Sequence, residues 1–94
     1  MVVPAIVTET ILEEAQRIVH ADREAVYAHP SEDYARVARL WSAYLGVELR
    51  PEQAAICMAL IKIARLAHTP AHRDSLVDLA GYAEVAARIQ GIDP

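Results

Sequence analysis

The sequence predicts an all-α protein, folded as an antiparallel four-helix bundle. Apolar residues recur with the 3.6-residue period of a helix in four segments, none alternates as a strand does, and helix-starting and helix-ending residues separate them. The short connections make successive helices antiparallel neighbours. At 94 residues the chain forms one domain, residues 1–94, in which residues 1–8 form an N-terminal extension.

The first predicted helix begins after Thr10, because Thr10 and Glu13 have the spacing of a capping box. The polar stretch HADRE interrupts its apolar stripe, which leaves open whether the helix continues to Tyr27. Pro30 ends it, since the residue before a proline disfavours the helical backbone. The stripe consists of Ile11, Leu12, Ala15, Ile18, Val19 and Val26.

The second predicted helix begins at Ser31, with Glu32 and Asp33 in the first turn, where the helix dipole favours acidic side chains. Gly46 is a natural residue for the turn that ends it. We expect its buried stripe to consist of Tyr34, Val37, Ala38, Trp41, Tyr44 and Leu45.

The third predicted helix covers residues 51–67 and begins at Pro51, a favoured first residue of a helix. It is apolar on nearly every side, which is typical of the central helix of a bundle. The fourth covers about residues 74–89, with Asp74 as a candidate cap, and ends before Gly91.

Composition restricts the partners. The apolar fraction, 54%, is high for a small chain, which predicts a homodimer or higher oligomer. The net charge of −4 and the lack of a basic stripe argue against nucleic-acid polymers and anionic membranes. No transmembrane run or signal peptide is recognisable. The single cysteine, Cys57, reads as a core residue, so we expect a cytoplasmic protein.

Two cations interrupt the third predicted helix. Lys62 and Arg65 lie one turn apart, and Asp74, Asp78 and Tyr82 are aligned on the next helix. A buried Lys62 requires an anion, for which Asp78 is the first candidate. Two interpretations stay open. Either the charges form a structural ion pair, or the cations hold a ligand phosphate or carboxylate while Asp74 and Asp78 bind Mg²⁺ or a ribose hydroxyl.

A second candidate cluster surrounds the loop after the first helix. Arg23 and Tyr27 lie one turn apart, and His29 follows in the loop, where binding groups are common. The alternative is an Arg23 in a surface ion pair beside a half-buried Tyr27. His68 and His72 do not share a helix face, so we expect no zinc site, and no catalytic residues are predicted.

These residues together resemble a family of small uncharacterised proteins of bacteriophages and prophages. The likeness covers about residues 10–86, through "ILEEAQRIVHADREAVYAHPSEDYARVARLWSAYL", "MALIKIARL" and "HRDSLVDLAGYAEV". The family usually has Tyr–Gly where this chain has Tyr27–Ala28. The residues that carry the likeness are Arg23, Tyr27, Trp41, Lys62, Ile63, Ala64, Arg65, Asp74, Asp78, Gly81 and Tyr82.

More distantly, the arrangement is similar to all-α nucleotide pyrophosphohydrolases of the MazG and dCTPase type. That resemblance implies an oligomer that binds Mg²⁺ through acidic residues of two helices and cleaves nucleoside triphosphates to monophosphates. Glu13, Glu14 and Asp78 match the acidic motifs. Arg17 and Ser75 stand where those enzymes have acidic residues.

Three functions are therefore compared. The first is the binding of a nucleotide-like phosphate ligand near Lys62, Arg65, Asp78 and the Arg23–Tyr27 loop, which would sequester nucleotides or host signalling nucleotides. The second is Mg²⁺-dependent pyrophosphohydrolysis by Asp74 and Asp78 with Glu13 or Glu14. The third is a protein–protein interaction module with a purely structural charge cluster.

Overall fold

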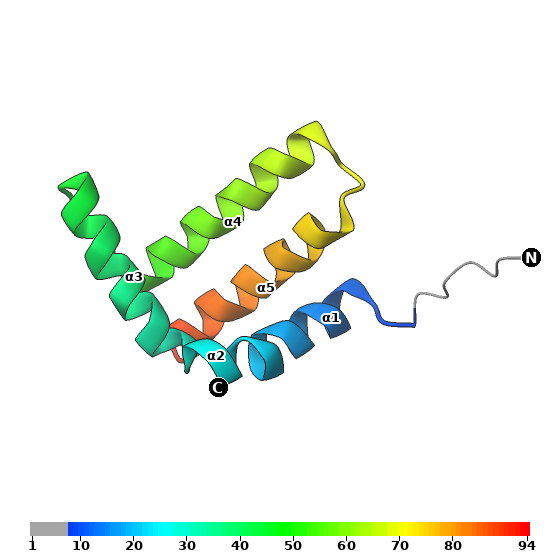
Figure 1. Ribbon diagram of the computed structural model, residues 1–94, viewed down its shortest axis with the longest axis horizontal. Helices are drawn as coiled ribbons and strands as arrows, with labels where there is room; N and C mark the ends of the chain where they lie inside the picture. The colour runs from blue at the N-terminus through cyan, green and yellow to red at the C-terminus, as the bar shows by residue number, and fades with distance from the viewer. Residues whose placement is uncertain (1–7) are drawn as a thin grey trace, which may run out of the picture.

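The structure, a computed structural model, describes residues 8–94, apart from the side chain of Asp22 (Figure 1). Its elements are α1 (Ile11–Arg17), the π-helical turn η1 (Ile18–Asp22), α2 (Glu24–Tyr27), α3 (Pro30–Leu45), α4 (Pro51–His68) and α5 (Arg73–Ile89). The all-α prediction is confirmed over this range, which contains no strand. The predicted extension at residues 1–8 lies, except for its last residue, outside the described part.

The first predicted helix continues to Tyr27 as one arm made of α1, η1 and α2. The amide of Arg23 donates to the carbonyl of Ile18 at 2.8 Å, five residues back, which defines the π turn. Such turns insert one extra residue and rotate the helix face that follows. The polar stretch therefore lies at a wider turn of the helix and does not interrupt it.

The helix starts follow the sequence signals in part. Thr10 and Glu13 form the predicted capping box, with Glu13 N donating to Thr10 Oγ1 at 3.1 Å. The predictions that Ser31 and Asp74 begin helices are wrong, since α3 begins at Pro30 and α5 at Arg73. Histidine rings cap α3 and α5 instead, because His29 Nδ1 accepts from Ser31 N and the ring of His72 accepts from the amide of Ser75.

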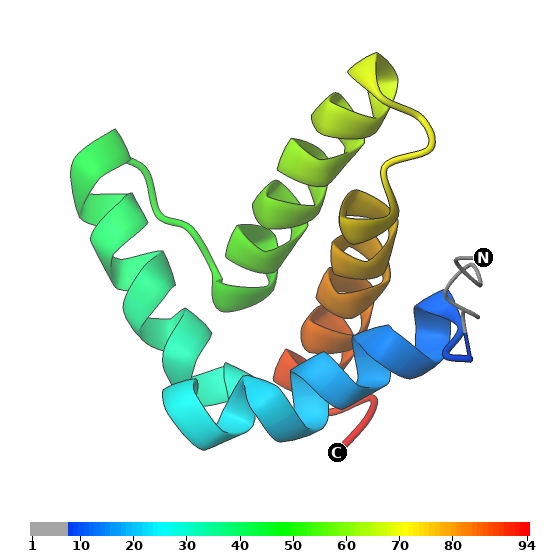
Figure 2. The ribbon, with the colours of Figure 1, turned by 45° about the vertical axis from the view of Figure 1, so that its right-hand side comes forward.

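The helices do not close into an antiparallel bundle in the single chain. α4 and α5 run antiparallel side by side, α1 packs on α5, and α3 diverges from α4 to form a V (Figure 2). The cause is the loop of residues 46–50, which runs back along α3. The amide of Leu49 donates to Ser42 Oγ at 2.8 Å, and Ser42 Oγ donates to the carbonyl of Ala38. α3 and α4 therefore point in similar directions.

Small side chains form the core. This lets helices approach closely but leaves large apolar residues outside it. The predicted burial of Tyr44 and Leu45 is wrong, since they are 90% and 57% exposed. α4 is also not a fully buried central helix, because its apolar residues reach solvent on one side. The buried hydrophobic residues are Ala15, Val19, Ala38, Ala54, Ala55, Val77, Val85 and Ala86.

A buried arginine joins the first arm to the last helix. Arg88 of α5 is 5% exposed, and its Nη2 donates to Glu24 Oε1 at 2.8 Å. Its Nη1 lies 3.5 Å from the carbonyl oxygen of Val19, within the π turn. No helix in the described range is both long enough and apolar enough to span a membrane.

The backbone of Ala28 predicts a stabilising substitution. Ala28 has φ 68° and ψ −169°, a region that glycine adopts freely and that costs other residues about 1–3 kcal/mol. The Ala28→Gly variant should therefore raise the free energy of unfolding by about 1 kcal/mol after the entropic cost of glycine. Urea unfolding measures this. Ala83→Gly, in the exposed interior of α5, should instead lower it by about 1 kcal/mol.

Candidate functional site

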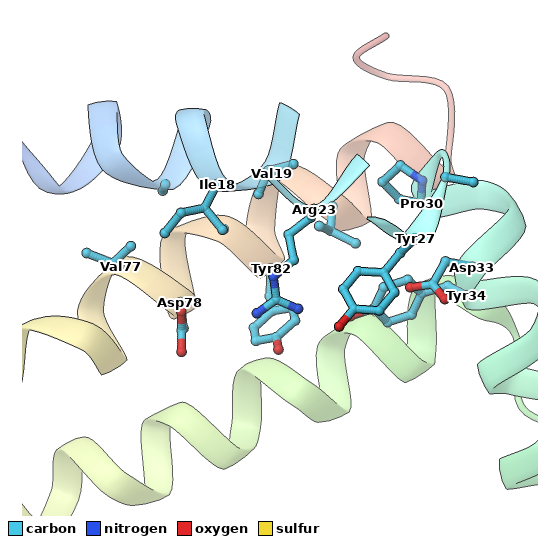
Figure 3. Close-up of a pocket in the computed structure, with 14 residues that line it drawn as sticks. Ile18, Val19, Arg23, Tyr27, Pro30, Asp33, Tyr34, Val77, Asp78 and Tyr82 are labelled. Carbon is cyan, nitrogen blue, oxygen red and sulfur yellow. The ribbon is translucent and has the colours of Figure 1, made fainter. Parts of the chain in front are cut away.

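A small pocket lies where the first arm, the start of α3 and the middle of α5 meet (Figure 3). It encloses about 60 Å³, several times the space that one water molecule requires. Its walls combine an apolar floor with a few polar groups. The lining residues are Ala15, Ile18, Val19, Arg23, Tyr27, Ala28, Pro30, Asp33, Tyr34, Val77, Asp78, Gly81, Tyr82 and Val85.

Local backbone geometry opens this space. Gly81 stands in the middle of α5, where a Cβ would lie 3.4 Å from Val19 Cγ2, so the missing side chain leaves room between α5 and the π turn. The π turn sets the direction in which Arg23 leaves the arm. The positive φ of Ala28 then turns the chain sharply into α3, which places Tyr27 and Pro30 on the same rim.

The pocket is lined by three tyrosines and one arginine, which make its wall aromatic and positively charged at one point. Figure 3 shows the Arg23 guanidinium in front of the Tyr82 ring, with Tyr27 on one side and Asp78 on the other. The guanidinium carbon lies 5.8 Å from the centre of the Tyr27 ring, within the range of a cation–π contact. Arg23 is exposed, so its charge faces the solvent at the mouth of the pocket.

Tyr34 forms part of the inner wall. Burial, with the neighbouring Tyr82 and Asp33 as smaller causes, raises the pKa of the Tyr34 phenol well above its usual value. The hydroxyl therefore stays protonated throughout the physiological range. It can donate a hydrogen bond to a ligand and also accept one.

The predicted anion for Lys62 is confirmed. Lys62 Nζ lies 2.9 Å from Asp78 Oδ2, and the two side chains are 13% and 29% exposed. The more buried member is the cation, so the carboxylate at the edge of the pocket neutralises a charge that water reaches poorly. Lys62 acts on the pocket only through Asp78, since it does not belong to the lining.

The structure brings together only part of the predicted ligand site. Arg23, Tyr27, Asp78 and Tyr82 line one pocket. Arg65 and Asp74 are exposed and lie outside that lining. The predictions that they bind ligand stay predictions.

His29 also lies outside the pocket lining, where both of its ring nitrogens have partners. Nδ1 accepts from the amide of Ser31 at 3.1 Å, and Nε2 is 3.0 Å from the main-chain oxygen of Pro94. The ring therefore connects the start of α3 to Pro94.

Two of the carboxylates expected to bind Mg²⁺, Asp78 and Glu14, lie beside cations of the chain instead. Asp78 pairs with Lys62, and Glu14 lies 3.6 Å from Arg73 and 3.7 Å from Arg17. Among the described side chains, which do not include Asp22, no three His, Cys, Asp or Glu residues gather as metal ligands would. A Mg²⁺ site on Asp74 and Asp78 therefore gains no supporting third ligand.

Ten of the 14 lining residues were absent from the predicted site, among them Tyr34, Asp33 and Gly81. Tyr34 was assigned to the buried stripe, and Asp33 to an ordinary first turn. Gly81 contributed only to the family likeness. A glycine inside an otherwise regular helix was the signal available, because it often marks a close approach or a space that a ligand uses.

Fold and site thus define a small all-helical domain with a tyrosine-lined pocket. The chain belongs to the family described as "Domain of unknown function (DUF6378)", whose pattern matches residues 10–90. This agrees with the predicted likeness to small phage proteins. Similarity to the MazG and dCTPase type is not shown, and no solved structure matches the chain significantly.

Two relatives are mycobacteriophage proteins. The chain is 48% identical over 82 residues to the "Gene 55 protein" of Mycobacterium phage D29, a match that covers 87% of this chain and 54% of that protein. It is 43% identical over 82 residues to the "Gene 55 protein" of Mycobacterium phage L5, covering 86% and 53%. The chain therefore spans about half the length of the curated relatives it matches.

The Lys62–Asp78 pair predicts an asymmetric response to mutation. Asp78→Ala should lower the free energy of unfolding by about 2 kcal/mol, because it leaves a mostly buried ammonium without its anion. Lys62→Met should cost less than about 1 kcal/mol, because Asp78 reaches water and methionine fills the same space. Urea unfolding of both variants measures this. Equal losses would contradict the asymmetry.

Proposed function

We propose that the pocket binds a small nucleotide-like ligand, with a ring among the tyrosines and a phosphate beside Arg23. The observation that carries this proposal is the convergence of Arg23, Tyr27, Tyr34 and Tyr82 on one pocket. Aromatic side chains stack on planar rings of any base, and arginine forms paired hydrogen bonds to phosphate oxygens.

The polar groups suit such a ligand. Asp78 can accept a hydrogen bond from a ribose hydroxyl, and the protonated Tyr34 hydroxyl can donate to or accept from a ring atom. The single exposed cation at the mouth matches one phosphate better than a triphosphate tail. This favours mono- or cyclic nucleotides as first candidates.

The pocket size sets how such a ligand would bind. An enclosed volume of about 60 Å³ is far below the roughly 300–1,000 Å³ of sites that surround a drug-sized molecule. One ring or one polar group enters, and the charged remainder lies across the rim at Arg23. As part of this proposal, such binding would sequester nucleotides or host signalling nucleotides in the host cytoplasm.

The assembled form is part of the same proposal. Large apolar side chains remain exposed on α3 and α4, which favours a homo-oligomer that covers them. Such an assembly would supply the helix neighbours that the open V lacks and so complete a bundle between chains.

Ligand binding is tested by thermal shift with mono-, di-, tri- and cyclic nucleotides at millimolar concentration. A ligand that binds the folded chain must raise its melting temperature by mass action. Arg23→Met should remove that rise and leave the melting temperature of the free protein unchanged. Arg39→Met, which changes another exposed arginine, on α3, is the matched control.

Two outcomes decide against this function. If no nucleotide raises the melting temperature, the function as a protein–protein interaction module becomes the better supported of the alternatives. Release of pyrophosphate from nucleoside triphosphates with Mg²⁺ would establish the hydrolase, although Asp78 and Glu14 already pair with cations.

Gly81→Ala separates binding from stability. The added methyl meets Val19 at ordinary contact distance and improves helix propensity, so the free energy of unfolding should stay level or rise by up to about 1 kcal/mol. The same methyl reduces the pocket, so the nucleotide-induced thermal shift should fall. An unchanged shift would place the ligand elsewhere.

A further inference from the structure

Two opposite charges line the pocket without pairing with each other. Arg23 and Asp78 both belong to the lining, and Figure 3 shows the Arg23 guanidinium with the Asp78 carboxylate on one side. In the part of the chain that the structure describes, Arg23 forms no ion pair with Asp78, whose Oδ2 instead lies 2.9 Å from Lys62 Nζ. A group outside the pocket lining therefore keeps the guanidinium available to a ligand.

Lys62 is that group. Its side chain is 13% exposed, whereas Arg23 is exposed, so water screens the charge of Arg23 more than that of Lys62. Attraction between opposite charges is stronger where water is scarce. Asp78 pairs with Lys62 rather than with Arg23, because the opposite choice would leave a mostly buried ammonium without an anion.

The pair also changes the charge that a ligand meets. Arg23 is the one cation among the described lining residues, and Asp33 and Asp78 are the two anions. Asp33 Oδ1 lies 3.8 Å from Arg36 Nη2, on α3. Lys62 neutralises Asp78 from outside the lining, so a phosphate bound to Arg23 meets little repulsion from the neighbouring carboxylate. Without Lys62, the same carboxylate would repel the phosphate and compete for the guanidinium.

Asp78 keeps the capacity to accept a further hydrogen bond. An ionised carboxylate accepts at two oxygens, and the contact with Lys62 involves Oδ2. The Asp78 side chain is 29% exposed, so a ligand can reach it. An acceptor beside a phosphate-binding cation suits a ribose, because a ribose carries its hydroxyl groups close to the phosphate. A 2′-deoxy ligand offers one donor fewer to this carboxylate.

We infer that Lys62 is a positioning residue of the nucleotide site. By pairing with Asp78 it keeps the Arg23 guanidinium free for the phosphate, and it presents the same carboxylate to a ribose hydroxyl. The pocket then selects ribonucleotides over 2′-deoxyribonucleotides. This inference rests on the proposed nucleotide binding and adds to it the class of sugar.

The first test requires no ligand. When Lys62→Met removes the ammonium, Asp78 becomes free to pair with Arg23. Arg23→Met should then lower the melting temperature by about 3 °C in the Lys62→Met background, against no change in the wild-type background. Arg39→Met should have no effect in either background. Equal effects of Arg23→Met in the two backgrounds would overturn the exchange of partners.

Titration calorimetry tests the consequence for binding, with the 5′-monophosphates and 3′,5′-cyclic monophosphates of the four ribonucleosides as probes. Lys62→Met should weaken binding about 10-fold or more, because Asp78 then occupies Arg23 and repels the phosphate. Adding Asp78→Asn should restore much of the lost affinity, since it removes the competing charge. A purely structural ion pair predicts instead a double variant that binds no better than Lys62→Met. Lys62→Arg, which keeps the cation, should retain most of the affinity.

The 2′-deoxy forms of the same nucleotides test the role of Asp78. The wild-type chain should bind the ribose forms about 10-fold more tightly, the effect of one hydrogen bond to a charged group. Lys62→Met combined with Asp78→Ala leaves no buried charge unpaired, and this variant should bind both sugars about equally. The ratio of the two affinities does not depend on the fraction of folded protein, so a loss of stability alone leaves it unchanged.

The outcomes separate this inference from the function on which it rests. A wild-type chain that binds none of these nucleotides overturns the proposed function and, with it, the selection of ribose. Wild-type binding that is unchanged in Lys62→Met, or equal for ribose and deoxyribose forms, overturns only the inference.

Discussion

The buried guanidinium of Arg88 holds the first arm on α5, and the pocket depends on that attachment. Arg88 reaches Glu24 of α2 and the Val19 carbonyl of the π turn, the two points between which the arm changes direction. A guanidinium removed from water keeps these partners because losing them leaves an uncompensated charge inside the protein. The positions of Arg23 and Tyr27 follow, since both belong to the same arm.

α5 is therefore the element around which the site is organised. It supplies Arg88 to the arm, Asp78 to Lys62 of α4, and Gly81 and Tyr82 to the pocket wall. The Arg88–Glu24 pair attaches the first arm to α5, and the Asp78–Lys62 pair attaches α4 to it. The missing side chain of Gly81 leaves a space between α5 and the first arm. The pocket depends on this combination, because the buried hydrophobic residues of the core are closely packed alanine and valine.

Local signals predicted the helices well because caps and periodicity act within a few residues. The capping box at Thr10, the turn at Gly46 and the start at Pro51 are all where the sequence placed them. The anion for Lys62 was also predictable, since the cost of an unpaired buried charge is large. The divergence of α3 was not, because it depends on the bond between Leu49 and Ser42, which no periodicity reveals. Arg65 shows why spacing along a helix does not by itself predict the members of a site. A residue three positions from Lys62 points about 60° away from it around the helix axis, which is enough to direct it away from α5.

The contact between His29 and Pro94 determines where the chain leaves the domain. The main-chain oxygen of Pro94 lies 3.0 Å from the His29 ring, next to Pro30 and Ala28 on the pocket rim. Anything joined after residue 94, whether a purification tag or a fluorescent label, emerges beside that rim. A reporter placed there would respond to a molecule that entered the pocket, whereas a bulky fusion partner at the same position would obstruct the rim.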